Sequence, residues 1–208
     1  YLDVGARDEA EAKAMVQVGD TAVYDTAAFV SGSRIISPYL DDRIACVVLL
    51  MAMEQLKATE NDLYFVFTVQ EEVGIRGART AAYGVDPDYG IAVDVTDSDD
   101  IPDAPHECSS MAGKGAAIKV MDSSVICHPA VVAKLDPLAK EQGIAAQKDI
   151  LKAGGTDAGA IHQTRAGVYT GGISIPTRYV HTPQEMADLD DIKACANLVA
   201  AFAQARFD

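Results

Sequence analysis

The chain has 208 residues, of which 49% are hydrophobic, enough to bury one sizeable core. Its 31 acidic and 17 basic residues give a formal net charge of -14, which opposes binding to phosphate backbones or anionic membrane surfaces. No stretch approaches the roughly 20 apolar residues that cross a bilayer, and the start lacks a signal-peptide pattern. We therefore expect a cytoplasmic protein with neither nucleic acid nor membrane as partner. Four scattered cysteines are expected to be reduced and mostly buried: Cys46, Cys108, Cys127 and Cys195.

Helix and strand signals alternate along most of the chain. Residues 1–37 have short apolar runs broken by Gly, Asp and Ser, typical of short strands and turns. Residues 44–57 predict a buried helix, and the β-branched and aromatic run 62–69 predicts a strand covered on both faces. Further helices are predicted at 76–83, 129–142, 157–162 and 189–207, and further strands at 89–93, 116–121, 145–151 and 167–173. This alternation predicts an α/β sandwich with a mostly parallel central sheet.

Several acidic residues fall where predicted strands end. Glu71 and Glu72 follow the run 62–70, Asp94 ends the run 89–93, and Asp41 precedes the first long helix. Ligands of open α/β sheets gather at the carboxyl ends of strands, and a buried carboxylate needs a cation, a metal or hydrogen bonds to replace its lost hydration. His181 adds an imidazole. This mixed donor set favours zinc, cobalt or manganese over calcium or magnesium.

Two metal ions bridged by one carboxylate could bind an attacking water and polarise a carbonyl together, with another carboxylate as proton shuttle. The pair Glu71-Glu72 also raises the possibility of a glycosidase. Successive side chains of an extended segment point to opposite sides, however, so the two cannot easily flank one glycosidic bond. The geometry favours the metal site.

Each candidate also has an ordinary structural explanation. Glu71 and Glu72 could lie in a solvated turn, Asp41 could be a helix N-cap, Asp94 a turn residue, and His181 a surface loop residue. Their occurrence together favours the site. The remaining histidines stay unassigned, with a loop expected for the first: His106, His128 and His162.

Five motifs in order resemble the tetrahedral aminopeptidases, metallopeptidase family forty-two, which includes deblocking and glutamyl aminopeptidases and proteins labelled endoglucanase. The resemblance covers nearly the whole chain. It implies a three-layer zinc-peptidase-like sandwich, with 1–37 as the remainder of a β-rich inserted dimerisation domain and 38–208 as the catalytic domain. It also implies homo-oligomers, from dimers to dodecamers. The motifs are Leu40-Asp41-Asp42-Arg43-Ile44, Gln70-Glu71-Glu72-Val73-Gly74-Ile75-Arg76-Gly77-Ala78, Gly113-Lys114-Gly115, Gly154-Gly155-Thr156-Asp157-Ala158 and Tyr179-Val180-His181-Thr182-Pro183.

The resemblance implies a role for each matching metal ligand. Asp41 corresponds to the ligand that bridges two divalent ions, zinc or cobalt, and is followed in the family by a cis peptide to Asp42. Glu72 and His181 correspond to ligands of one ion, and Asp94 to the terminal carboxylate ligand of the other. The family has a further metal-binding His before the inserted domain, a place that none of the four His residues here occupies. We therefore expect weak binding of the second ion and little or no activity from this chain alone.

The resemblance also implies peptide substrates, with Glu71 as general base and the loop residues Gly155, Thr156 and Asp157 shaping the substrate pocket. The leading hypothesis is hydrolysis of the N-terminal peptide bond. Two rivals stay open: another co-catalytic metallohydrolase on the same scaffold, such as a carboxypeptidase or deacylase, and an inactive assembly fragment. Thr182 stands where Ser is usual, which keeps a small hydroxyl and should matter little.

Overall fold

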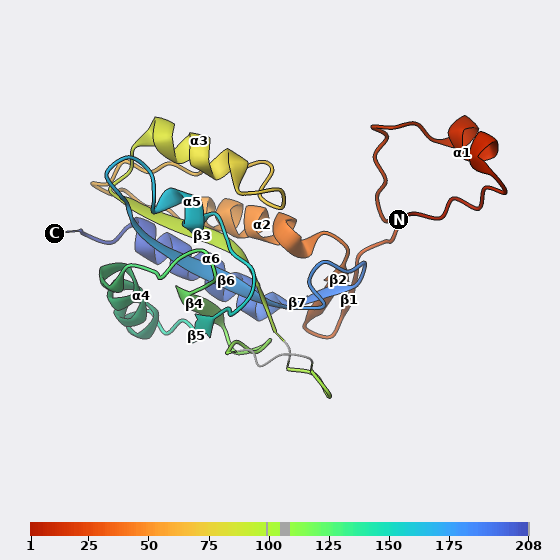
Figure 1. Ribbon diagram of the computed structural model, residues 1–208. Coiled ribbons are helices and arrows are strands. Elements are labelled where there is room, and N and C mark those ends of the chain that lie inside the picture. The colour runs from red at the N-terminus through yellow and green to blue at the C-terminus, as the bar shows by residue number, and fades with distance from the viewer. Residues whose placement is uncertain (99, 105–108, 208) are drawn as a thin grey trace.

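A central sheet lies between two layers of helices in the computed structural model, which describes residues 1–98, 100–104 and 109–207 (Figure 1). One face carries α2 (Leu40–Glu54), α4 (Pro129–Glu141) and α6 (Leu189–Ala203), and the other carries α3 (Arg76–Val85) and the short α5 (Ala158–Ile161). The predicted three-layer α/β sandwich is therefore confirmed. His106 and Cys108 lie outside the described residues. Within the described ranges, no helix is both long and apolar enough to span a bilayer.

The sheet is mixed, which corrects the prediction of a mostly parallel one. In the described residues it has seven strands, of which six follow the order β1-β2-β7-β6-β4-β5 and β3 pairs with β6. Only β3–β6 and β4–β5 are parallel, and the other four ladders are antiparallel. Short connections such as those between β1 and β2 and between β6 and β7 allow only antiparallel pairing. The strands are β1 (Phe29–Ser31), β2 (Arg34–Ser37), β3 (Tyr89–Asp97), β4 (Ala116–Met121), β5 (Ala146–Ile150), β6 (Tyr169–Arg178) and β7 (Glu185–Asp188).

The main core lies between the sheet and the layer of α2, α4 and α6. Val48 of α2 and Leu198 of α6 are fully buried there, together with Ile173 and Ile175 of β6. Helix α2, which was predicted to be buried, is covered on one side only. Three of its apolar residues, spaced three apart, face solvent: Val47, Leu50 and Met53.

Residues 62–69 do not form the predicted strand. They pair with no strand in the described residues. The exposure of residues 61–66 nevertheless alternates with the period of two that an extended chain shows. A strand needs a neighbour within hydrogen-bonding distance, and a cavity of about 1100 Å³ separates this segment from β3. The strand prediction for residues 62–69 is therefore wrong for the described structure, in which no segment pairs with them.

The region before β1 contains a helix where short strands were predicted. Helix α1 (Glu9–Met15) lies away from the sheet and buries no residue (Figure 1). Ala, Glu and Lys are strong helix formers, Asp8 caps the first turn by accepting a hydrogen bond from Glu11 N, and Lys13 pairs with Glu9 one turn earlier. Local propensity and capping therefore explain this helix without tertiary contacts.

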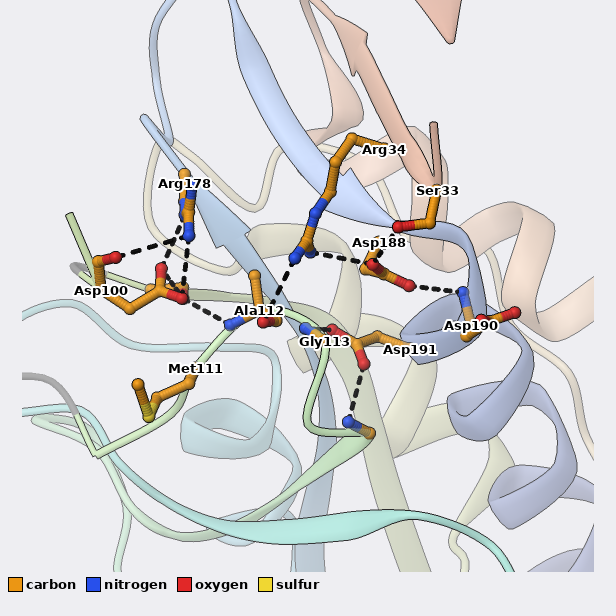
Figure 2. Close-up of polar contacts among 12 residues, drawn as sticks. Ser33, Arg34, Asp100, Met111, Ala112, Gly113, Arg178, Asp188, Asp190 and Asp191 are labelled. Atoms are coloured by element: carbon orange, nitrogen blue, oxygen red, sulfur yellow. Dashed lines mark hydrogen bonds and ion pairs between the residues drawn. The ribbon is translucent and has the colours of Figure 1, made fainter. Parts of the chain in front are cut away.

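A polar network fixes the start of α6 to the loops around it, as Figure 2 shows. Asp188 accepts from Asp190 N as the helix N-cap and forms an ion pair of 3.0 Å with Arg34. Asp191 accepts from the backbone N–H groups of Gly113 and Gly115 at 2.6 and 2.7 Å. At Gly115, φ is +89° and an added Cβ would lie 2.1 Å from a backbone oxygen, so only glycine fits. The Gly113-Lys114-Gly115 motif thus anchors the entry to β4.

Candidate metal centre

Three side chains from distant parts of the chain converge beside β3. Asp41 lies at the start of α2, Glu72 follows the segment 62–69, and His181 lies in the turn between β6 and β7. His181 Nε2 lies 2.9 Å from Asp41 Oδ2 and 3.3 Å from Glu72 Oε2. One donor atom of each residue lies within 4.8 Å of the other two. One imidazole and two carboxylates around a common centre can hold zinc or a similar divalent ion.

A second group consists of the carboxylates of Asp41, Asp42 and Asp94, which also approach one another within 4.8 Å. Asp41 belongs to both groups. The peptide bond between Asp41 and Asp42 is cis, as the family resemblance implied. Asp94 is only 8% exposed, and Asp42 Oδ1 is buried without a hydrogen-bond partner. Three crowded carboxylates with an orphaned oxygen fit a divalent cation better than a metal-free core.

Sequence reasoning did not propose Asp42 as a ligand. In a regular helix, successive side chains point about 100° apart, so neighbouring Asp residues would not share a centre. The backbone leaves helical geometry at both residues, with ψ of 108° at Asp41 and 40° at Asp42. The only sequence signal was the doubled Asp.

Burial and mutual repulsion make these carboxyls hold protons when no cation is bound. Burial, and next the charge of Glu72, raise the pKa of Asp41 to about 7. Burial, and next Asp94, raise the pKa of Asp42 to about 10. The pKa of Asp94 is also raised, mainly by burial and then by Asp41. A bound divalent ion would replace these protons.

The metal-free chain should lose stability as pH rises. Because these carboxyls bind protons more tightly in the folded chain than at their unfolded pKa near 3.9, the folded state holds more protons above about pH 4. The protonation of Asp41 therefore makes the free energy of unfolding fall between about pH 4 and pH 7. The protonation of Asp42 makes it fall further, up to about pH 10. Thermal unfolding in a chelator should show a falling Tm across this range, and zinc should raise Tm more at pH 8 than at pH 5.

The matched variant for this prediction is Asp42→Asn, which removes one buried acid at nearly constant volume. Its metal-free Tm should fall less between pH 5 and 8 than that of the unchanged chain. An identical pH profile for the two proteins would show that Asp42 does not carry the effect.

Glu185 holds the backbones of two candidate ligands together. This residue is 2% exposed and opens β7; its Oε2 accepts from Asp41 N at 3.0 Å and its Oε1 accepts from His181 N at 2.8 Å. Sequence analysis missed it, because its spacing of four residues from His181 carries no distinctive pattern. One carboxylate thus fixes α2 and the β6–β7 turn relative to each other.

Replacing Glu185 with alanine should weaken zinc binding by about 10- to 100-fold, the usual effect of removing a partner that orients metal ligands. Competition with a fluorescent zinc chelator would measure this. Glu60→Ala is the control, because the Glu60 side chain is 86% exposed, its carboxylate lies 4.0 Å from Arg206, and Glu60 belongs to neither donor group. Equal affinities of the two variants for zinc would contradict the positioning role.

Glu71 lines the cavity next to the two groups of candidate metal ligands. It is half-buried and lines the same cavity of about 1100 Å³ as Asp41, Glu72 and Asp94. Burial, and next the charges of Glu72 and Asp157, raise the pKa of Glu71. A carboxyl with a raised pKa is suited to accept and return a proton during catalysis.

The predicted substrate loop is only partly open to this cavity. Asp157 lines it, accepts from Thr68 Oγ1 at 2.7 Å, and has a buried Oδ1 without a partner. Thr156 is 1% exposed and its hydroxyl donates to Asp122 at 3.1 Å. An added Cβ at Gly155 would lie 2.9 Å from the side chain of Ser124. Among these three, Asp157 is the one placed to meet a ligand.

The described histidines other than His181 lie outside both groups. His128 caps α4 by accepting from Ala130 N, and His162 follows α5 next to Gln163. Of the eight non-glycine residues with positive φ in the described residues, three sit at the centre or next to a candidate residue in sequence: Tyr39 at 62°, Gln70 at 60° and His181 at 63°. Such conformations cluster at functional sites.

The chain matches the model of the M42 glutamyl aminopeptidase family over residues 1–198. It is 50% identical over 199 residues to a protein of Acetivibrio thermocellus named "Putative aminopeptidase", covering 96% of this chain and 60% of that protein. Its structure is similar to an aminopeptidase of the archaeon Desulfurococcus kamchatkensis, with a TM-score of 0.90, 42% identity, and coverage of 97% and 58%. The TET1 peptidase of Pyrococcus horikoshii, which can assemble into a tetrahedron or a large octahedral shell, gives a TM-score of 0.80 at 32% identity, covering 97% of this chain and 59% of its own.

The structural similarities show the class of protein: the chain has the zinc-peptidase-like α/β sandwich fold of the TET aminopeptidases. Within this class, the chain belongs to the M42 glutamyl aminopeptidase family. It spans about 60% of the length of the Acetivibrio relative.

Proposed function

We propose that this chain carries the metal centre of an aminopeptidase that removes N-terminal residues from peptides with the help of two divalent ions, zinc or cobalt. The observation that carries the proposal is the pair of donor groups that share Asp41. Asp41 would bridge the ions, Glu72 and His181 would hold one, and Asp94 the other, with Asp42 beside it. The bound ions would polarise the scissile carbonyl and lower the pKa of a water molecule.

Glu71 would act on the proton of the attacking water. Its side chain faces the shared cavity, and its raised pKa lets it accept that proton and pass it to the leaving amine. The loop Gly155-Thr156-Asp157 would shape the substrate pocket, with Asp157 supplying a carboxylate toward the substrate. Buried carboxylates that fix the ligands, above all Glu185, would keep the donors in place when an ion is released.

We further propose that residues 1–37 are the remainder of a β-rich dimerisation domain and 38–208 the catalytic domain. The Pyrococcus horikoshii relative can assemble into a tetrahedron or a large octahedral shell, which supports a homo-oligomer for the protein to which this chain belongs. Strand β1 pairs with β2 and β2 pairs with β7, so the proposed boundary at residue 37 would fall at the end of a strand of the main sheet.

Metal analysis combined with hydrolysis of aminoacyl-anilides tests the function. Peptides with free and with blocked termini separate the rivals, because an aminopeptidase needs a free α-amino group, whereas a carboxypeptidase needs a free carboxylate and a deacylase a blocked amine. Cleavage restricted to free N-termini supports the proposal. Full metal occupancy without turnover on any of these substrates would favour an inactive assembly fragment.

A further inference from the structure

The turn that follows β4, residues 122–125, is built around one buried carboxylate. Asp122 is 3% exposed, and its Oδ1 accepts from Ser124 N and Ser124 Oγ at 2.7 Å each and from Val125 N at 3.0 Å. Three donors on one oxygen replace hydration that burial removes, and they fix the shape of the turn. The other oxygen, Oδ2, accepts none of these three bonds.

Oδ2 of Asp122 binds the substrate loop, by which we mean Gly155-Thr156-Asp157. Thr156 Oγ1 donates to this oxygen at 3.1 Å, and Thr156 is 1% exposed, so its hydroxyl lies in the protein interior. One residue before the loop, Gly154 O accepts from Ser123 N at 3.0 Å and also from Ser123 Oγ. The turn therefore holds the chain on both sides of Gly155.

The turn and the loop are also in close contact. An added Cβ at Gly155 would lie 2.9 Å from Ser124 Oγ, and one at Gly159 of α5 would lie 2.6 Å from Ser124 Cβ. Only glycine permits an approach this close. The Cβ at Gly159 would also lie 3.5 Å from Ile75 Cδ1, and Ile75 N donates to Glu71 O at 2.8 Å. Helix α5 is therefore packed between the turn and the segment that carries Glu71.

A second side-chain bond holds the loop from the other side. Asp157 Oδ2 accepts from Thr68 Oγ1 at 2.7 Å, and Thr68 precedes Glu71 by three residues. Asp157 and Glu71 line the cavity, whereas Thr156 and Asp122 do not. The bond from Thr156 to Asp122 therefore fixes the backbone from which the Asp157 side chain reaches the cavity.

We propose that Asp122 is a positioning residue for substrate binding. It belongs to neither donor group and does not line the cavity, but it holds the substrate loop through Thr156. This proposal rests on the proposed function, in which the loop shapes the substrate pocket. Loss of the bond should raise KM with little change in kcat, because a loosened loop weakens binding of substrate and transition state alike, while the metal ligands and Glu71 stay in place.

Thr156→Val tests the bond, because valine keeps the shape of threonine and removes the hydroxyl that donates to Asp122. Amide hydrogen exchange should become about tenfold faster in this variant at three N–H groups whose acceptors lie in or next to the loop. These bonds join Ser123 N to Gly154 O, Gly159 N to Thr156 O and Ala160 N to Asp157 O. Thr170→Val is the matched control and should leave their exchange unchanged, because Thr170 is also 1% exposed but its hydroxyl donates to Val168 O.

Hydrolysis of aminoacyl-anilides by the form of the protein that shows activity gives the functional readout. Thr156→Val and Asp122→Ala should each raise KM by about tenfold. We expect kcat to change by less than about threefold and the affinity for zinc to stay the same. Thr170→Val should keep the KM of the unchanged protein. If circular dichroism shows that Asp122→Ala does not fold, Thr156→Val decides alone.

Three results would overturn the role of Asp122. Unchanged exchange in Thr156→Val would show that the bond does not hold the loop, and faster exchange with an unaltered KM would show that the loop does not affect substrate binding. A loss of zinc affinity as large as the rise in KM would place the effect at the metal centre. Absence of turnover in the unchanged protein is a distinct result, which would overturn the proposed function and the substrate role of Asp122 with it.

Discussion

Turnover should fall by about a hundredfold to ten-thousandfold when Glu71 is replaced with glutamine, while zinc content stays unchanged. Glutamine keeps the size of the side chain but cannot accept the proton of the attacking water. Glu71 does not belong to either donor group, so the metal ligands stay in place. Aminoacyl-anilide hydrolysis measures turnover and elemental analysis measures zinc, both on the form of the protein that shows activity.

Glu72→Gln is the matched control, because it makes the same change one residue along the chain. Glu72 lies 3.3 Å from His181 Nε2 within a donor group, so this variant should lose zinc as well as turnover. Retained activity in Glu71→Gln would remove Glu71 from the role of base. Equal loss of zinc in both variants would show that Glu71 is a ligand instead.

Replacement of His181 with asparagine should weaken zinc binding by more than about a hundredfold. Loss of a residue that only orients a metal ligand weakens binding by up to about a hundredfold, and loss of a ligand itself should cost more. His181 supplies the sole imidazole of its donor group, and without it only the carboxylates of Asp41 and Glu72 remain there to hold the ion. Asparagine is chosen because the backbone at position 181 has φ of 63°, a conformation that Asn tolerates. Isothermal titration with zinc on the unchanged chain and the variant measures the difference.

Two controls accompany this variant. His162→Asn makes the same substitution outside the donor groups and should bind zinc normally. Added imidazole should partly restore zinc binding to His181→Asn, because the His181 side chain is 68% exposed and its place is open to solvent. Normal affinity in His181→Asn would exclude His181 as a ligand.

Local motifs mark four of the residues that the structure brings together at the candidate centre, and leave two unmarked. Asp41, Glu72, Asp94 and His181 were each marked by their place next to a strand or helix, and the structure brings them into two groups that share Asp41. Asp42 and Glu185 were not found. Asp42 joins its group through an irregular backbone, and Glu185 acts by accepting hydrogen bonds from residues 144 and 4 positions away. Neither effect leaves a periodic trace in sequence.

The sequence by itself determined the type of most elements, the α/β class and the motifs of the family, because these depend on hydrophobic period, capping and turn residues within short windows. Tertiary structure decided the direction of each strand, since β6 pairs antiparallel with β4 and parallel with β3 through contacts between distant residues. It also decided that the strand-like residues 62–69 stay unpaired. Backbone pairing needs a second segment at the right distance, and a single window of sequence does not contain it.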